Sequence, residues 1–191
     1  MLKHETITLK GRDAGLKVRL TELPALLADR AARVALKALG QEPAGGIVSL
    51  ALEHLQAARA AQVTGAVDLQ AFVQADWTDG SGHMHALDMR KLSDWRSVEQ
   101  IQNAALLLHI SFLIGRETLE VPVSFQAAQI LSKTADVRAT WCSPQIAGVL
   151  SAKLASYREL ETVLSVEDVY NLCEILNVDA LRDFQATQVN K

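Results

Sequence analysis

Near its N-terminus the chain alternates polar and apolar side chains in two short segments, residues 6–10 and residues 16–20. The residues between them, from Gly11 to Gly15, have the composition of a turn. Alternation with a period of two is typical of a strand with one buried face, so this pattern predicts a β-hairpin over residues 1–22. A single hairpin is only marginally stable in water. The rest of the chain must therefore supply a body that covers the apolar face of the hairpin.

That body is predicted to be helical. Hydrophobic residues make up 49% of the 191 residues but aromatic residues only 5%, so Ala, Leu and Val must fill the core. Ala and Leu favour helices and close helix packing. A helical pair is expected over residues 23–64, starting around Thr21 or Glu22, and a helical body over residues 93–191. Together these features predict an α+β fold, mainly α, in a single domain.

A second small β-hairpin is predicted for residues 65–92, because two apolar segments flank the turn sequence Thr-Asp-Gly-Ser-Gly at 78–82. Ser93 is the expected N-cap of the next helix. The second half of that helix, residues 104–110, is nearly apolar all round and should be deeply buried.

Further helix starts are predicted in the C-terminal half. Ser143 followed by a proline has the pattern of an N-cap with Pro in the first turn. Ser165 and Asp168 have the spacing of a capping box, which predicts the start of the final helix. Between residues 110 and 143, a break is expected at residues 121–125 and a helix at residues 126–135.

Charge and hydropathy argue against several classes of function. The formal net charge is −3, so the chain has no overall attraction to phosphate backbones or anionic lipid. No secretory signal is visible at the N-terminus, and the longest apolar run, residues 104–114, is too short to span a bilayer. We therefore expect a cytoplasmic protein that binds neither membrane nor nucleic acid. Cys142 and Cys173 are expected to be reduced, small buried hydrophobes.

No catalytic residue, cofactor site or metal site is predicted. His83 and His85 could share one face of a strand, with Asp76 and Asp79 nearby, but no further ligand stands at a recognisable spacing. His109 lies in an apolar helix, where a hydrogen-bonded core histidine is the more frequent case. The motifs of serine hydrolases, zinc proteases and nucleotide-binding loops do not occur. The chain is therefore not expected to be an enzyme.

An alternative function is suggested by residues 164–184, which fit a helix-turn-helix DNA-binding regulator. The pattern is a capped helix, a short break near Asn177 and a second helix. That second helix, residues 179–186, carries two acidic residues and the single base Arg182. Contacts to several phosphates would need several basic residues, so DNA binding is the second expectation.

Three segments together resemble tail assembly chaperones of long-tailed, siphovirus-type bacteriophages and prophages. The first is the hairpin at residues 5–20 running into Glu-Leu-Pro-Ala at 22–25. The second is Asp-Trp-Arg-Ser at 94–97, which leads into an apolar helix that ends in Leu-His and a phenylalanine, Phe112. The third is the helix from Leu-Glu at 160–161 to Val-Asp-Ala at 178–180. These motifs encode helix entries and packing, and they carry no catalytic chemistry.

The resemblance implies a function in virion morphogenesis. A member of this family would bind the tape measure protein, a long helical protein, and keep it soluble in the host cytoplasm until the tail tube protein polymerises around it. Such a chaperone needs an apolar surface for a helical client and an affinity low enough for displacement. The final helix is the best candidate for that surface, with Tyr170, Leu172 or Leu176 partly exposed and available for client binding or for homo-oligomer formation.

Overall fold

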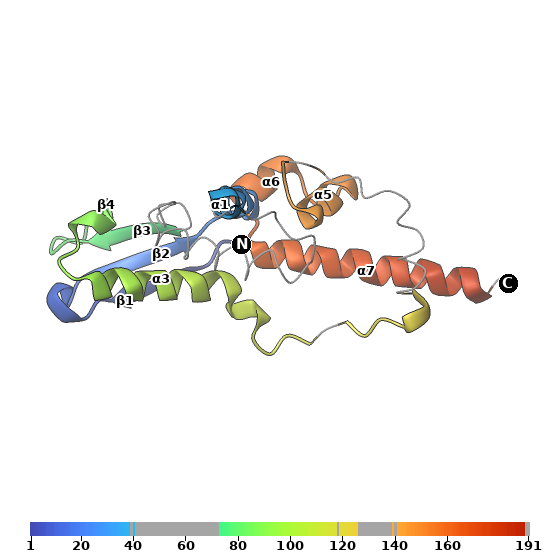
Figure 1. Ribbon diagram of the computed structural model, residues 1–191, viewed down its shortest axis with the longest axis horizontal. Coiled ribbons are helices and arrows are strands. Elements are labelled where there is room, and N and C mark those ends of the chain that lie inside the picture. The colour runs from blue at the N-terminus through green and yellow to red at the C-terminus, as the bar shows by residue number, and fades with distance from the viewer. Residues whose placement is uncertain (39, 41–72, 118, 126–138, 140, 190–191) are drawn as a thin grey trace.

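The computed structural model describes residues 1–38, 40, 73–117, 119–125, 139 and 141–189 (Figure 1). These residues form the predicted α+β fold, mainly α. A β-sheet with one helix on it makes up one end of the molecule, and a long helix extends to the other end (Figure 1). The predicted helix at residues 126–135 and the second helix of the pair at residues 23–64 lie outside the described residues.

The predicted N-terminal hairpin is confirmed as strands β1 (His4–Thr8) and β2 (Lys17–Glu22). The predicted second hairpin is also confirmed, as β3 (Val73–Thr78) and β4 (Met84–Ala86). The two hairpins are not separate, because β3 pairs antiparallel with β2 and gives one four-stranded sheet in the order β1-β2-β3-β4. Burial alternates along β2, as expected for a sheet with one covered face.

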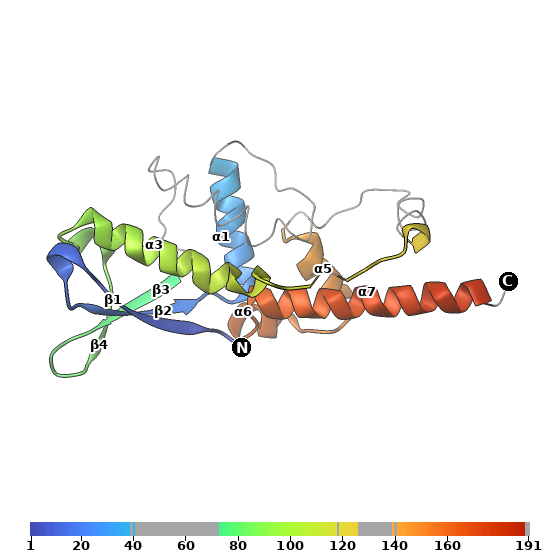
Figure 2. The ribbon, with the colours of Figure 1, turned by 90° about the horizontal axis from the view of Figure 1, so that it is seen from below.

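Helix α3 (Trp95–Ile110) covers one face of this sheet (Figure 2). Its buried residues Ile101, Ala105 and Leu108 pack against Leu9, Val18 and Leu20 of the hairpin. The N-cap prediction was wrong by one residue, because the carboxylate of Asp94, not the hydroxyl of Ser93, accepts the Arg96 N–H.

The predicted deep burial of the second half of α3 holds only in part. Leu108 is buried, but Leu107 is 51% exposed. A sheet covers only one side of a helix, so an apolar residue on the other side stays in solvent.

A second core lies where α1 (Ala25–Ala38), α5 (Pro144–Ser151) and α6 (Tyr157–Thr162) meet the long helix α7 (Val166–Val189). Helix α1 begins later than predicted, since Glu22 is still part of β2. Asp29 of α1 is buried and accepts hydrogen bonds from the backbone N–H and the hydroxyl of Ser143. Ser143 therefore occupies the predicted N-cap position of α5, but its side chain anchors α5 to α1.

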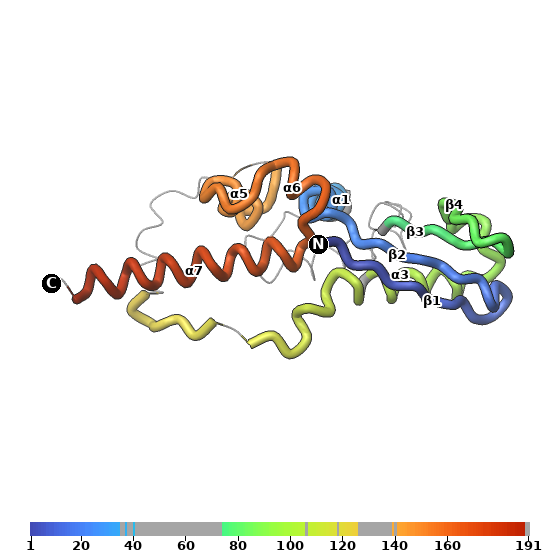
Figure 3. The backbone as a smooth tube through the Cα atoms, turned by 180° about the vertical axis from the view of Figure 1, so that it is seen from behind, coloured from blue at the N-terminus to red at the C-terminus, as the bar shows by residue number. Residues whose placement is uncertain are grey.

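Helix α7 is continuous from Val166 to Val189. The break predicted near Asn177 was therefore wrong, and this segment lacks the turn that a helix-turn-helix requires. The helix is about 36 Å long at 1.5 Å per residue, and its C-terminal half extends beyond α5 and α6 (Figure 3). Short 3-10 turns lie at Gly11–Asp13, Met89–Lys91 and Ser111–Leu113. Residues 123–125 are helical, so the break predicted at residues 121–125 was wrong for its second part. None of the described helices has the length and apolar content needed to cross a membrane.

Candidate functional site

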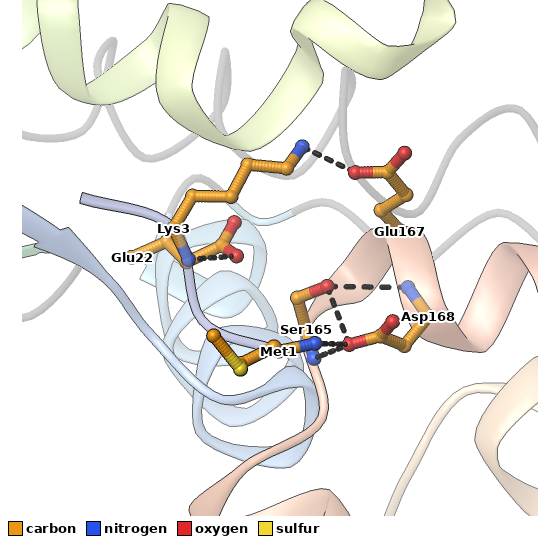
Figure 4. Close-up of polar contacts among 6 residues, drawn as sticks. All are labelled: Met1, Lys3, Glu22, Ser165, Glu167 and Asp168. Carbon is orange, nitrogen blue, oxygen red and sulfur yellow. Dashed lines mark hydrogen bonds and ion pairs between the residues drawn. The ribbon is translucent and has the colours of Figure 1, made fainter. Parts of the chain in front are cut away.

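The start of α7 is held by a group of charged side chains (Figure 4). Ser165 and Asp168 form the predicted capping box, in which the Ser165 N–H donates to Asp168 Oδ2 at 2.8 Å and the Asp168 N–H donates to Ser165 Oγ at 3.2 Å. The amino group of Met1 donates to the same carboxylate, and Lys3 forms an ion pair with Glu167. Carboxylates in the first turn also interact favourably with the helix dipole. These contacts attach the first strand to the beginning of α7.

Two buried polar residues fix the connection from β2 to α1. The Glu22 carboxylate accepts the Lys3 N–H at 2.7 Å, and burial raises the pKa of Glu22 above its ordinary value. His109 is 1% exposed, its Nδ1 lies 2.8 Å from the Ala105 carbonyl oxygen, and its Nε2 accepts the Leu23 N–H at 3.2 Å. Because the backbone N–H of Leu23 can only donate, His109 Nε2 must be unprotonated, and the neutral ring carries its proton on Nδ1. Burial also lowers the pKa of His109. His109 is thus the hydrogen-bonded core histidine that was predicted.

The three residues predicted to form a partner surface lie mostly on the inner side of α7. Tyr170 is only 7% exposed, and its ring packs edge-on against Phe112 with the centroids 5.1 Å apart. Tyr170 is therefore not the partly exposed residue among the three that were predicted. Leu172 and Leu176 are partly buried and pack against the second core, so each keeps some accessible surface.

The opposite side of α7 carries a hollow of about 400 Å³, which we call the α7 groove. Residues at helical spacing line it: Asn171, Glu174, Ile175, Val178, Asp179 and Arg182. Ile175 is 49% exposed, so about half of its apolar side chain remains open to solvent at this hollow. The groove therefore combines the apolar residues Ile175 and Val178 with the charged residues Glu174, Asp179 and Arg182.

One flank of α7 is occupied by the segment that follows α3. Phe125 packs edge-on against Phe184, with the ring centroids 5.4 Å apart. Arg116 lies over the ring of Phe112 and forms an ion pair with Glu174 at 2.5 Å. These contacts attach the segment to α7 at Glu174, which lines the groove, and at Phe184.

Sequence reasoning missed Ile175. The final helix has apolar residues over a wide arc, and a pattern of apolar positions does not say which side meets the core. The side that faces away from the core can be found from the angle around the helix axis between a residue and Cys173, whose thiol is buried. Two residues further along, Ile175 lies about 200° around the helix and must point away from that core.

The two histidines of the second hairpin organise its turn. His85 Nε2 lies 2.9 Å and His83 Nδ1 lies 3.8 Å from the carboxylate of Asp79. The same carboxylate accepts the backbone N–H groups of Ser81 and His83, and the hydrogen bond with His85 lowers the pKa of Asp79 most strongly. Within the described part of the chain, no group of three His, Cys, Asp or Glu side chains is arranged to hold a metal ion.

A second hollow, of about 320 Å³, lies beside the sheet next to Trp77. The two carboxylates that line this hollow already accept hydrogen bonds from nearby backbone N–H groups. Asp13 accepts the N–H groups of Ser93 and Asp94, and Asp88 accepts the N–H of Arg90. The geometry of this hollow is explained by loop connections, which leaves the α7 groove as the better candidate site.

The sequence matches no protein-family model and no curated protein, and the fold matches no solved structure. The candidate function therefore depends on the geometry of the α7 groove together with the sequence patterns described above.

Proposed function

We propose that this chain is a non-enzymatic, cytoplasmic chaperone of phage tail assembly, which binds the tape measure protein until the tail tube polymerises. The observation that carries the proposal is the α7 groove, with Ile175 49% exposed on the outward side of a long helix. A tape measure protein presents apolar stripes along its helices before assembly. Such a stripe can pack against the α7 groove as a second helix.

The composition of the groove suits a client that must later be released. Among the described residues that line it, Ile175 and Val178 are the apolar ones, and Glu174, Asp179 and Arg182 are charged. Complete burial of a side chain such as Ile175 contributes about 1.5–3 kcal/mol, and ordering the client helix offsets part of this. Binding by one groove should therefore be weak, so polymerising tube protein can displace the chaperone.

The proposal can be tested with two variants that introduce the same charge on different sides of α7. Ile175→Asp places a carboxylate in the groove, whereas Ala180→Asp places one on an exposed position about 140° away around the helix. Each variant is co-expressed with the tape measure protein of the same phage, and the soluble fraction of the client is measured. Circular dichroism verifies that both variants fold.

We expect the Ile175→Asp variant to leave most of the client insoluble and the Ala180→Asp variant to behave as wild type. If both folded variants keep the client soluble as well as wild type does, the α7 groove is not the binding surface. If the wild-type chain itself does not solubilise the client, the proposed function is wrong.

A further inference from the structure

Strand β1 forms one edge of the sheet, and its hydrogen-bonding pattern is fixed by the contacts at its two ends. The Glu22 N–H donates to the Lys3 carbonyl at 3.0 Å, and the Leu9 N–H donates to the Leu16 carbonyl at 2.9 Å. Hydrogen-bonded and non-hydrogen-bonded pairs alternate along an antiparallel ladder. The odd-numbered residues of β1 therefore bond to β2, and the backbone groups of the even-numbered residues point away from it.

The outward-pointing residues are His4, Thr6 and Thr8, which pair in register with Thr21, Arg19 and Lys17 of β2 without exchanging hydrogen bonds. Each offers one N–H and one carbonyl to the open edge. All three side chains are exposed. Helix α3 lies over the face of the sheet, and Figure 2, which looks toward β1, shows no described element in front of this edge.

Two common protections of an edge strand, a proline and a β-bulge, are missing from β1. The strand His4–Thr8 contains no proline, its one acidic residue is Glu5, and its register with β2 runs without a bulge. An edge of this kind is a template for pairing with another strand. The amino-acid sequence of β1 then decides which strand fits.

We propose that β1 pairs antiparallel with β1 of a second copy of this chain, about a two-fold axis at Thr6. In this register Thr6 faces the partner's Thr6, and His4 faces the partner's Thr8. On the α3 side of the sheet, Glu5 faces the partner's Ile7, which brings the two partly buried Ile7 side chains into diagonal contact. No like charges stand opposite one another, and Thr–Thr pairs are favourable cross-strand neighbours.

Self-pairing in this register is isologous and closes after two copies, so it yields a dimer and not a filament. The two sheets become one continuous sheet, and each of the three outward residues exchanges two backbone hydrogen bonds with its opposite residue. Helix α7 extends away from the sheet (Figure 1), and none of the described residues that line the α7 groove belongs to β1. Self-association and client binding can therefore fail independently.

Disulfide trapping tests the register directly. Opposite residues of a hydrogen-bonded antiparallel pair have Cα atoms about 5.5 Å apart, within the range of a disulfide. Cys142 and Cys173 are buried, so a cysteine introduced into β1 is the accessible thiol.

Under mild oxidation, Thr6→Cys should give a covalent dimer, and Thr8→Cys alone should not, because Thr8 faces His4 of the partner subunit. A mixture of Thr8→Cys and His4→Cys chains should give the mixed dimer. Dimer formation that is no faster for Thr6→Cys than for Thr8→Cys overturns the proposal.

A second variant measures the strength of the pairing. The Thr6 N–H points outward and is not used within the sheet, and proline is tolerated on an edge strand at such a position. Thr6→Pro should therefore leave the fold intact and weaken dimerisation by about tenfold or more, because it removes hydrogen bonds at the axis. Analytical ultracentrifugation of wild type and variant over a range of concentrations gives this ratio. A wild-type chain that stays monomeric throughout contradicts the inference, as does an unchanged dimer in Thr6→Pro.

Discussion

Acid should destabilise this fold through His109. The ring is buried and neutral, and its Nε2 accepts the Leu23 N–H. Protonation of Nε2 would place two donors, Nε2–H and the Leu23 N–H, opposite each other and would bury a charge. Burial lowers the pKa of His109 from its ordinary value of 6.5 in the folded chain. Between that lowered pKa and pH 6.5, the unfolded chain binds a proton that the folded chain does not. Over this window the free energy of unfolding should fall by about 1.4 kcal/mol for each unit that the pH drops.

Well above pH 6.5 the ring is neutral in both states, and His109 contributes no dependence on pH. Two variants separate titration from hydrogen bonding. His109→Gln cannot titrate but keeps an amide that can accept the Leu23 N–H. His109→Leu leaves that N–H without an acceptor, which should cost about 1–3 kcal/mol at neutral pH.

The assay is urea unfolding followed by circular dichroism, at several pH values between about 5 and 7.5. Other carboxylates and histidines titrate equally in wild type and in the Gln variant, so the difference between their slopes isolates His109. We expect a steeper loss of stability below pH 6.5 in wild type than in His109→Gln. Equal slopes would refute the buried, neutral ring and its hydrogen bond to Leu23.

Three further predictions concern other buried groups. Since burial raises the pKa of Glu22, the stability contributed by its protonated form is lost as the pH rises through that pKa. Glu22→Gln should therefore increase the free energy of unfolding by about 1 kcal/mol at pH 8 and change it little near pH 4, as measured by urea unfolding at both values. Asp29→Ala removes the acceptor that joins α1 to Ser143 and should cost about 2–3 kcal/mol in the same assay; a loss below about 0.5 kcal/mol would contradict this role. Cys142 and Cys173 are buried with their thiol pKa values raised, so Ellman's reagent should modify them only as fast as the chain opens; immediate reaction in the native protein would be the opposite result.

Local sequence signals predicted the elements that are determined by local chemistry. The alternation of polar and apolar side chains on both sides of Gly11 to Gly15 predicted the first hairpin, and the spacing of Ser165 and Asp168 predicted the start of α7. These features depend on residues close together in the chain. The same reasoning placed one N-cap at Ser93 when Asp94 takes that position, because two adjacent residues were both good caps.

Features that depend on distant partners were not predictable. Nothing in the sequence of either hairpin shows that β2 pairs with β3, since that register joins residues more than fifty positions apart. Tyr170 was one of three residues of which partial exposure was expected, but Phe112 and Ala28 from other segments pack against it. For the same reason the outward side of α7, with Ile175, became apparent only when its packing against α5 was known.

Site-specific photo-crosslinking can show whether a helical client lies against the α7 groove. A photo-reactive amino acid is placed at Ile175, inside the groove, or at Ala180, on an exposed position outside it. Each chain is co-expressed with the tape measure protein and irradiated in the cell. If the client lies against the α7 groove, we expect a covalent adduct with the tape measure protein from position 175 and little or none from position 180. Adducts of equal yield from both positions, or none from position 175 while the client stays soluble, would contradict it.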